Sequence, residues 1–218
     1  MAIVPGCGGA SEAAPATHTL RAFTPRDELC VTEGRVQVGP GGLAIAEPAV
    51  RAFVVGSFGD AAALAFTFRG ATAQTRKLAS GAARRQLGLK LRAANSCNVV
   101  YVMWRLDPKP ELEVSVKYNP GMRTHKECGA SGYTKLEPRA PAPDLEIDSA
   151  HALAAEIAGD ELTASIDGRV VWRGRLPSTA REIVGPAGLR TDNVAIEISR
   201  LAIADGKNAT ACRRESSD

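Results

Sequence analysis

The chain has 218 residues, of which 44% are hydrophobic, 23% charged and 5% aromatic, and its formal net charge is +3. So small a charge, without clustered Lys and Arg, excludes the electrostatic footprint of a nucleic-acid binder. No run of about 18 apolar residues occurs, so no segment is predicted to cross a membrane as a helix. The length fits one large all-β domain. We expect it over residues 20–212, between a flexible tether (1–19) and a disordered tail (213–218).

The N-terminal segment holds a cysteine in a distinctive setting. Cys7 follows Ile3-Val4-Pro5-Gly6 and precedes a small-residue stretch, Ala10–Thr17. This resembles the lipobox and tether of bacterial lipoproteins, which implies lipidation at Cys7. Pro5 and the short segment before it depart from that pattern, which has a charged region and an apolar run of roughly 7–15 residues. A start codon further upstream would supply both. The alternative is a plain disordered N-terminus.

Short strands separated by turn residues follow along the chain. Apolar and polar side chains alternate in most of them, which is typical of antiparallel strands that cover a core on one side. Turn signals about every ten residues favour a β-sandwich. Asn98–Leu106 is apolar on both faces, which predicts a central strand. The predicted strands are Arg35–Val38, Leu43–Ala46, Val50–Val55, Leu64–Phe68, Arg85–Leu91, Asn98–Leu106, Glu111–Lys117, Ala152–Ala158, Glu161–Ile166, Val170–Leu176 and Val194–Ile203.

Helix signals are weak. We expect at most a turn or two of helix at Ser57–Leu64, Ser80–Arg84 and Pro177–Arg181. The proline-rich segment Pro138–Pro143 is predicted to be a surface crossover, because neither side of it has enough strands to fold alone. Asp192-Asn193 is predicted to stabilise a turn, since it offers too few oxygens for a calcium ion.

The stretch His151–Ala204 says most about the fold. Gly159-Asp160 and Asp167-Gly168 suit tight hairpins, so the three runs beside them are predicted to form a meander. The turn Gly185–Arg190 then leads into a closing strand. This order resembles the C-terminal half of concanavalin A-like lectin and glucanase sandwiches. It is similar to laminin-G-like modules and to bacterial 3-keto-disaccharide hydrolase-type domains. The resemblance implies an all-β antiparallel jelly roll in a single domain.

Five cysteines are present without a CxxC pair, so no zinc site is expected, and no other metal or cofactor. Cys97 opens a predicted strand and Cys128 lies in the loop that follows, which predicts one disulfide. Concanavalin A-like sandwiches commonly bring their first and last strands together, so the resemblance implies a second bond, Cys30–Cys212. Oxidised pairs place a protein outside the cytoplasm. The alternative is four reduced, buried thiols.

An acidic motif bears on whether the chain is a hydrolase. Glucanases of the resembled fold carry Glu-x-Asp-x-x-Glu, whereas Glu146-Ile147-Asp148 lacks the final Glu. Retaining hydrolysis needs two carboxyl groups about 5 Å apart, so no catalysis is expected at this motif. His151 suits a general base. A lone His without a partner nearby in the sequence more often has a structural role.

The segment Cys97–Tyr133 is the best candidate for a binding site, and it is similar to stretches in bacterial proteins of myxobacterial type. The resembled fold holds glycans on its concave sheet face through aromatic stacking and polar hydrogen bonds. Stacking requires Tyr101 or Trp104 to be exposed. The predicted ligand-binding residues are Tyr101, Arg105, Lys117, Asn119, Arg123 and His125.

A competing interpretation gives this region no ligand. Tyr101 and Met103 would then belong to the core. The basic residues of the neighbouring strands would form a solvated sheet face, made of Arg69, Lys90, Arg92 and Arg105.

We therefore expect a non-catalytic extracytoplasmic binding module, secreted or held in the bacterial cell envelope, for a carbohydrate or another surface polymer. Contact with a membrane is expected only through a lipid at Cys7, and no nucleic-acid partner is expected. The competing functions are a glycan-active hydrolase of the 3-keto-disaccharide hydrolase type and a purely structural or interaction domain.

Overall fold

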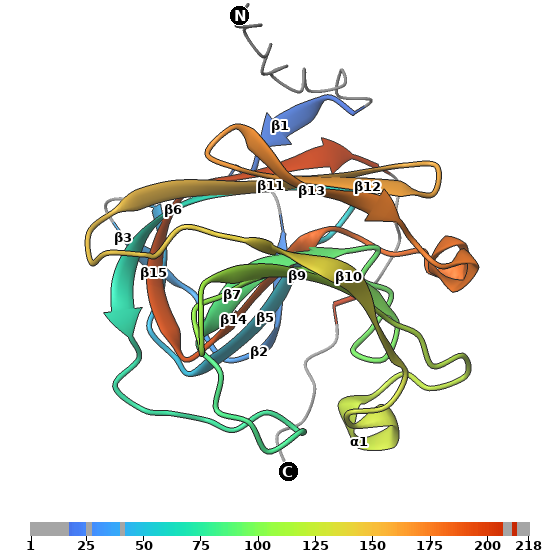
Figure 1. Ribbon diagram of the computed structural model, residues 1–218, viewed down its shortest axis with the longest axis horizontal. Coiled ribbons are helices and arrows are strands. Elements are labelled where there is room, and N and C mark those ends of the chain that lie inside the picture. The colour runs from blue at the N-terminus through green and yellow to red at the C-terminus, as the bar shows by residue number, and fades with distance from the viewer. Residues whose placement is uncertain (1–17, 25–27, 40–41, 207–210, 213–218) are drawn as a thin grey trace, which may run out of the picture.

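The computed structural model describes residues 18–24, 28–39, 42–206 and 211–212. These residues form two antiparallel β-sheets packed face to face (Figure 1). The described helical elements are one turn of α-helix, α1 (His125–Cys128), and one 3-10 helix, η1 (Ser178–Glu182). The predicted all-β sandwich is therefore confirmed. Cys7 and the predicted C-terminal tail lie outside the described residues.

Sheet A has eight strands in the order β13-β12-β11-β6-β15-β4-β3, with β1 paired to β15. The predicted three-strand meander is present as β11, β12 and β13. The strands of sheet A are β1 (Leu20–Ala22), β3 (Gln37–Gly39), β4 (Gly42–Ile45), β6 (Ser57–Ala71), β11 (Ala150–Ala158), β12 (Glu161–Ile166), β13 (Arg169–Arg175) and β15 (Val194–Asp205).

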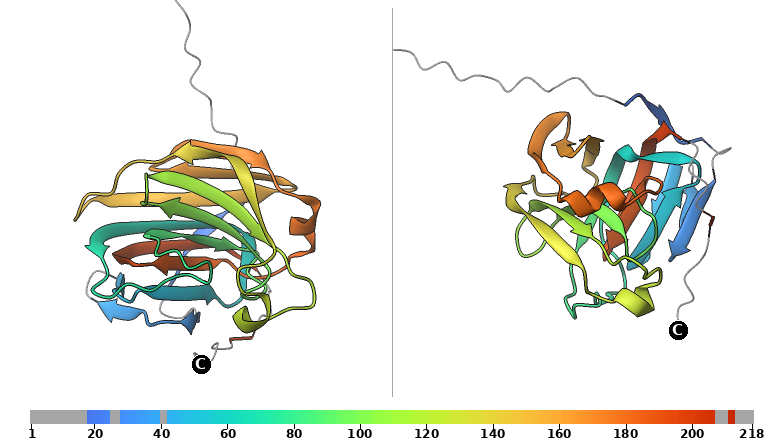
Figure 2. Two further views of the ribbon diagram at one scale, coloured as in Figure 1. Left: turned by 60° about the horizontal axis from the view of Figure 1, so that its bottom comes forward. Right: turned by 90° about the vertical axis from the view of Figure 1, so that its right-hand side faces the viewer.

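Sheet B has seven strands in the order β10-β9-β8-β7-β14-β5-β2. Two further views show the strands of both sheets curving around a shared core (Figure 2). The strands of sheet B are β2 (Leu29–Glu33), β5 (Ala49–Val54), β7 (Gln86–Leu91), β8 (Val99–Arg105), β9 (Glu111–Lys117), β10 (Tyr133–Pro141) and β14 (Gly188–Asp192).

Alternate side chains of sheet B build the core. Leu, Val and Trp side chains of β7, β8 and β9 point toward sheet A and are buried, as the period-two pattern predicts. Trp104 is fully buried, with its indole N–H donating to the carbonyl of Pro143 at 3.1 Å. Its ring meets that of Phe66 edge-on, at 6.0 Å between centroids. Trp104 therefore joins the two sheets and is not open to a ligand.

Two predicted helical turns are corrected. Ser57–Leu64 is the first half of the 15-residue strand β6, which pairs with both β11 and β15. Its small Ala residues fit a central strand because the neighbours on both sides supply the hydrogen bonds and the packing that propensity does not. Ser80–Arg84 is a turn followed by irregular chain. Pro177–Arg181 matches η1, so that prediction is confirmed.

Two predicted connections are strands instead. The first four residues of Pro138–Pro143 belong to the edge strand β10, where a proline without an N–H is tolerated. Gly188–Arg190, expected in a turn, opens β14, which lies between β5 and β7 at the centre of sheet B. The local Gly and Pro signals hid a strand whose partners are far away in the sequence.

Both predicted disulfides are present. Cys30–Cys212 has a sequence separation of 182 and Cys97–Cys128 one of 31. The second bond ties α1 to the segment just before β8.

We predict that replacing Cys97 and Cys128 together with Ser lowers the free energy of unfolding by about 3–4 kcal/mol. The reason is that the bond restricts the unfolded chain by closing a loop of this length. Urea denaturation followed by circular dichroism measures the difference. A loss below about 1 kcal/mol would contradict the prediction.

Candidate functional site

The face of sheet B that points away from sheet A carries mostly charged and polar residues beside a small buried apolar cluster that includes Val99 and Met103, and we call it the outer face. The segment between β6 and β7, and also α1, lie on this side of the sandwich (Figure 1). Its charged and polar residues alternate with the core residues along each strand. The outer face includes Arg51, Gln86, Lys90, Tyr101, Arg105, Glu111, Glu113, Lys117, Tyr133, Arg190 and Asp192.

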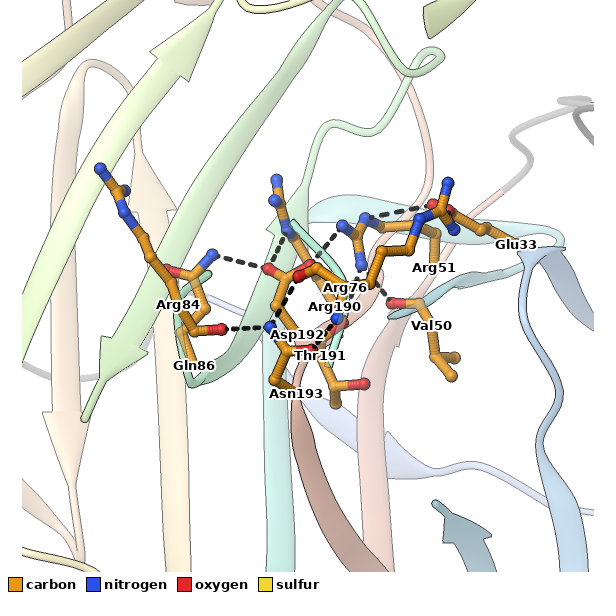
Figure 3. Close-up of polar contacts among 10 residues, drawn as sticks. All are labelled: Glu33, Val50, Arg51, Arg76, Arg84, Gln86, Arg190, Thr191, Asp192 and Asn193. Carbon is orange, nitrogen blue, oxygen red and sulfur yellow. Dashed lines mark hydrogen bonds and ion pairs between the residues drawn. The ribbon is translucent and has the colours of Figure 1, made fainter. Parts of the chain in front are cut away.

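A buried carboxylate organises the centre of the outer face (Figure 3). Asp192 is 1% exposed and accepts hydrogen bonds from Arg51 on β5, from the Gln86 amide on β7 at 2.6 Å and from the Arg190 Nε at 2.8 Å. Burial alone would raise the pKa of Asp192, but Arg51, Arg190 and the Gln86 bond lower it to about 2. The three strands are thus joined by one ionised group.

The neighbouring Asn193 holds the segment that runs beside this cluster. Its backbone is in the left-handed region at φ 55°, which Asn tolerates. The side-chain amide donates to the carbonyls of Arg76 at 2.9 Å and Arg84 at 2.8 Å, and its oxygen accepts from the Arg76 N–H at 2.7 Å. Asn193 therefore anchors residues far away in the sequence. The predicted role of Asp192 in stabilising its own turn is wrong.

A second ionic group lies at the β9 end of the outer face. The Arg105 Nη1 contacts Glu111 Oε1 at 2.9 Å and Glu113 Oε2 at 3.0 Å. Arg139 on β10 contacts the same two oxygens, at 2.6 and 3.1 Å. Both carboxylates are buried, so neither is presented to a ligand.

An aromatic pair lies beside these ionic groups. Tyr101 is 5% exposed and its ring stacks on Tyr133, with 6.2 Å between centroids and 21° between planes. The Arg190 guanidinium lies 4.9 Å from the Tyr101 ring centroid, and Lys117 Nζ lies 5.2 Å from that of Tyr133. Burial raises the pKa of Tyr101 to about 12. Tyr133, at 38% exposure, is the ring that faces solvent.

The structure brings three of the six predicted ligand-binding residues onto one face: Tyr101, Arg105 and Lys117. The Asn119 amide instead donates to the carbonyls of Cys97 and Ser131 and so holds the loop. Arg123 and His125 are exposed around α1. The site as a set of six stays a prediction. The exposed Tyr101 or Trp104 that stacking required is absent, because both rings are buried, and the aromatic ring exposed on this face is that of Tyr133.

The competing solvated basic face is wrong. Lys90 and Arg105 are both buried on the outer face. Arg69 lies in sheet A, paired with Asp148 and Glu197, and Arg92 pairs with Asp60.

Sequence reasoning missed several residues of the outer face. Glu111 and Glu113 alternate with apolar residues in a correctly predicted strand, so the signal for a polar face was present. Arg190 and Asp192 were hidden in an apparent turn. Tyr133 was hidden in an apparent loop, because β10 is recognised only through its pairing with β9.

The acidic motif Glu146-Ile147-Asp148 precedes β11 in sheet A and does not share the outer face. Both carboxylates are exposed, and that of Asp148 pairs with Arg69. They form no cleft with the buried Glu111 and Glu113.

His151 has a carboxylate partner that its sequence neighbourhood did not show. Its Nδ1 lies 2.8 Å from Asp167 in the β12–β13 turn, and its Nε2 lies 3.1 Å from the Ser149 hydroxyl. The ring packs edge-on against Trp104 at 5.4 Å. Ser149, His151 and Asp167 stand in the order of a nucleophile, base and carboxylate. However, the Ser149 hydroxyl donates its proton to the Glu146 carbonyl at 2.5 Å and not to His151. We therefore interpret the contacts of these three side chains as structural, at the edge of the core.

Among the described residues, no group of three or more His, Cys, Asp and Glu is placed to hold a metal ion. Nor does that part of the chain contain a helix with the length and apolar character needed to span a membrane.

No family model matches the chain, and no curated protein matches it in sequence. Solved structures do share its fold. The carbohydrate-binding module CBM66 from Bacillus subtilis has a TM-score of 0.56 at 11% identity, covering 79% of this chain and 92% of that one. An endo-acting O-glycanase of the human gut microbiota has 0.52 at 11%, covering 90% and 96%. The apo Crh5 transglycosylase has 0.50 at 17%, covering 91% and 90%. At these identities the likeness shows the fold alone, which is that of concanavalin A-like sandwiches.

We predict that Asp192→Asn lowers the free energy of unfolding at neutral pH by about 3–5 kcal/mol, because it leaves Arg51 and Arg190 buried without their anion. Since the folded-state pKa of Asp192 is depressed to about 2, its stabilisation is present above roughly pH 4 and is lost as pH falls toward 2. The difference in the free energy of unfolding between the wild type and Asp192→Asn should therefore become smaller as the pH falls from roughly 4 toward 2.

Denaturant unfolding at a series of pH values between 2 and 7 measures this difference. Asp144→Asn is the matched control, since Asp144 is exposed. An equal loss of stability in the two variants, or a difference that does not change with pH, would contradict the role given to Asp192.

Proposed function

Because the chain is a concanavalin A-like sandwich, we propose that it is a non-catalytic module that binds a carbohydrate on the outer face of sheet B. The observation that carries the proposal is the exposed Tyr133 ring beside the polar groups of this face. An aromatic ring with a few fixed polar groups is the combination that sugar sites use. The fold neighbours include a carbohydrate-binding module and an O-glycanase, which supports this class of ligand.

The outer face offers a pre-organised strip. Tyr133 stacks on Tyr101, which in turn lies under Arg190, and Asp192 fixes Arg190. Lys117 is held next to Tyr133 by the carbonyl of Gly129 at 2.8 Å. A ligand that stacks on Tyr133 therefore meets side chains whose rotamers are already set, which lowers the entropic cost of binding.

The geometry favours binding over hydrolysis. Glycosidases place two carboxyl groups on either side of the bond to be cleaved. On the outer face, Glu111 and Glu113 are buried and held by Arg105 and Arg139. The two carboxylates on β9 therefore have a structural role, because they link this strand to Arg105 on β8 and Arg139 on β10.

We place the protein outside the cytoplasm, since two disulfides form and persist in oxidising compartments. A lipid on Cys7 would hold it at a bacterial envelope. Mass spectrometry of the protein purified from its native cells tests that part, because the Cys7 peptide either carries a diacylglycerol group or does not.

We predict that Tyr133→Ala weakens glycan binding at least about fivefold, because stacking on an aromatic ring contributes on the order of 1 kcal/mol or more beyond polar contacts. The measurement is binding of the purified protein to a glycan array, followed by calorimetric titration of the best ligand.

Phe58→Ala is the matched control. Phe58 is the comparably exposed aromatic of sheet A, at 42%, and it lines a shallow pocket of about 250 Å³ together with Arg92 and Val184. Loss of binding in Phe58→Ala with none in Tyr133→Ala would move the site to that pocket. A protein that binds no glycan on the array would overturn the proposed function.

A further inference from the structure

The disulfide beside the outer face has a buried cation as its neighbour. Lys117 is 1% exposed, and its Nζ lies 3.1 Å from the Sγ of Cys128 and 2.8 Å from the carbonyl oxygen of Gly129. The same ammonium lies 5.2 Å from the centroid of the Tyr133 ring. A disulfide sulfur carries no charge, whereas the thiolate that forms on reduction is stabilised by an adjacent ammonium. The position of Lys117 therefore favours the reduced form of Cys128.

The other sulfur of this bond also has a contact that suits the reduced state. The Sγ of Cys97 lies 2.9 Å from the carbonyl oxygen of Thr124. A disulfide sulfur has no hydrogen to donate, whereas the S–H of a free Cys97 thiol would donate to this oxygen. One cysteine of the pair is thus placed to become a thiolate and the other to become a thiol.

Hydrogen bonds hold the loop between the two cysteines independently of the disulfide. The Asn98 amide donates to the carbonyl of Met122 at 2.9 Å, and the Ser96 hydroxyl donates to that of Arg123 at 3.2 Å. The two bonds of the Asn119 side-chain amide, at 3.2 and 3.1 Å, add to these. The two sulfurs should therefore stay close to each other after reduction, so that the bond can form again.

From these contacts we infer that the Cys97–Cys128 disulfide is a redox switch of the outer face, opened by a dithiol reductant in the folded protein. Reduction releases α1 from the segment before β8, and the loop that contains α1 leads directly into Tyr133, the first residue of β10. The exposed ring is then held less firmly and binds a glycan more weakly. This effect on binding rests on the proposed function, whereas the ease of reduction does not.

The chemistry is thiol–disulfide exchange. A thiolate of the dithiol attacks the Sγ of Cys97, the S–S bond breaks, and its electron pair leaves with the Sγ of Cys128 as a thiolate beside Lys117. The second sulfur of the dithiol attacks the first, and Cys97 leaves and takes up a proton. The protein gains two electrons and one proton, and the dithiol loses two electrons and two protons, one of them to solvent.

The exchange requires the loop to open. Both cysteines are buried, whereas residues 120–127 between them are exposed and contain a single helical turn. Exposed segments with little regular structure open locally at a low cost in free energy. A local opening of this loop therefore admits the dithiol without unfolding the sandwich.

The test equilibrates the purified protein with mixtures of reduced and oxidised dithiothreitol. Free thiols are then alkylated and quantified by mass spectrometry, so that Cys30–Cys212 is an internal reference. The variant is Lys117→Met, and its matched control is Lys135→Met, which removes an exposed charge from β10. Circular dichroism checks that each sample is folded.

A second measurement does not depend on the folding of Lys117→Met. Cys97→Ser and Cys128→Ser each leave one free thiol of the pair. The ultraviolet absorbance of a thiolate at neutral pH compares the two variants.

We expect Cys97–Cys128 to be reduced at a ratio of reduced to oxidised dithiothreitol about tenfold lower than Cys30–Cys212. Lys117→Met should raise the ratio needed for Cys97–Cys128 about tenfold, the range for a hydrogen bond to a charged group. Cys30–Cys212 should not change, and Lys135→Met should match the wild type. Cys97→Ser should show a thiolate and Cys128→Ser should not.

Glycan binding is measured on the oxidised protein and on the protein in which Cys97–Cys128 alone is reduced, with the best ligand from the array. We expect reduction to weaken binding about threefold, within the entropic cost of ordering one side chain. Unchanged affinity would overturn the effect on binding. A lack of binding by the oxidised protein would overturn the proposed function and this effect with it, but not the ease of reduction.

Three results would overturn the redox switch itself. The first is equal reducibility of the two disulfides. The second is an unchanged ratio for Cys97–Cys128 in folded Lys117→Met. The third is the same absorbance in Cys97→Ser and Cys128→Ser, which would show that Lys117 stabilises no thiolate.

Discussion

The outer face of sheet B depends on one buried ion. Asp192 is surrounded by Arg51, Arg190 and Gln86, which come from three adjacent strands. An ionised carboxylate is costly to bury unless charged and hydrogen-bonding partners surround it, so β5, β14 and β7 must keep the register that supplies them. That register sets the direction of Arg190, and Arg190 in turn covers Tyr101. The polar face is therefore as rigidly specified as the apolar core on the other side of the same strands.

Much of the fold could be predicted from local patterns. β9 and β12 have the predicted bounds, because strict alternation and clear turns mark both ends. β14 was missed, since Gly188–Asp192 reads as a turn and is a strand only because β5 and β7 pair with it across long stretches of sequence. The first half of β6 was missed for the same reason. Alanines carry little preference of their own, and the strands on either side decide their conformation.

Three of the six predicted ligand-binding residues lie on one face of sheet B. Alternation alone places Tyr101, Arg105 and Lys117 on one side of their strands. It does not reveal which residue covers which, so the exposed ring, Tyr133, could not be separated from the covered Tyr101.

The bond between Cys30 and Cys212 has a mechanical consequence. Every strand from β3 to β15 lies between these two cysteines, so a pulling force applied to the chain outside them passes through the covalent bond and bypasses the sandwich. Only β1 and the start of β2 lie on the loaded path. A domain crosslinked in this way keeps the strands from β3 to β15 folded under tension for as long as the sulfur–sulfur bond holds.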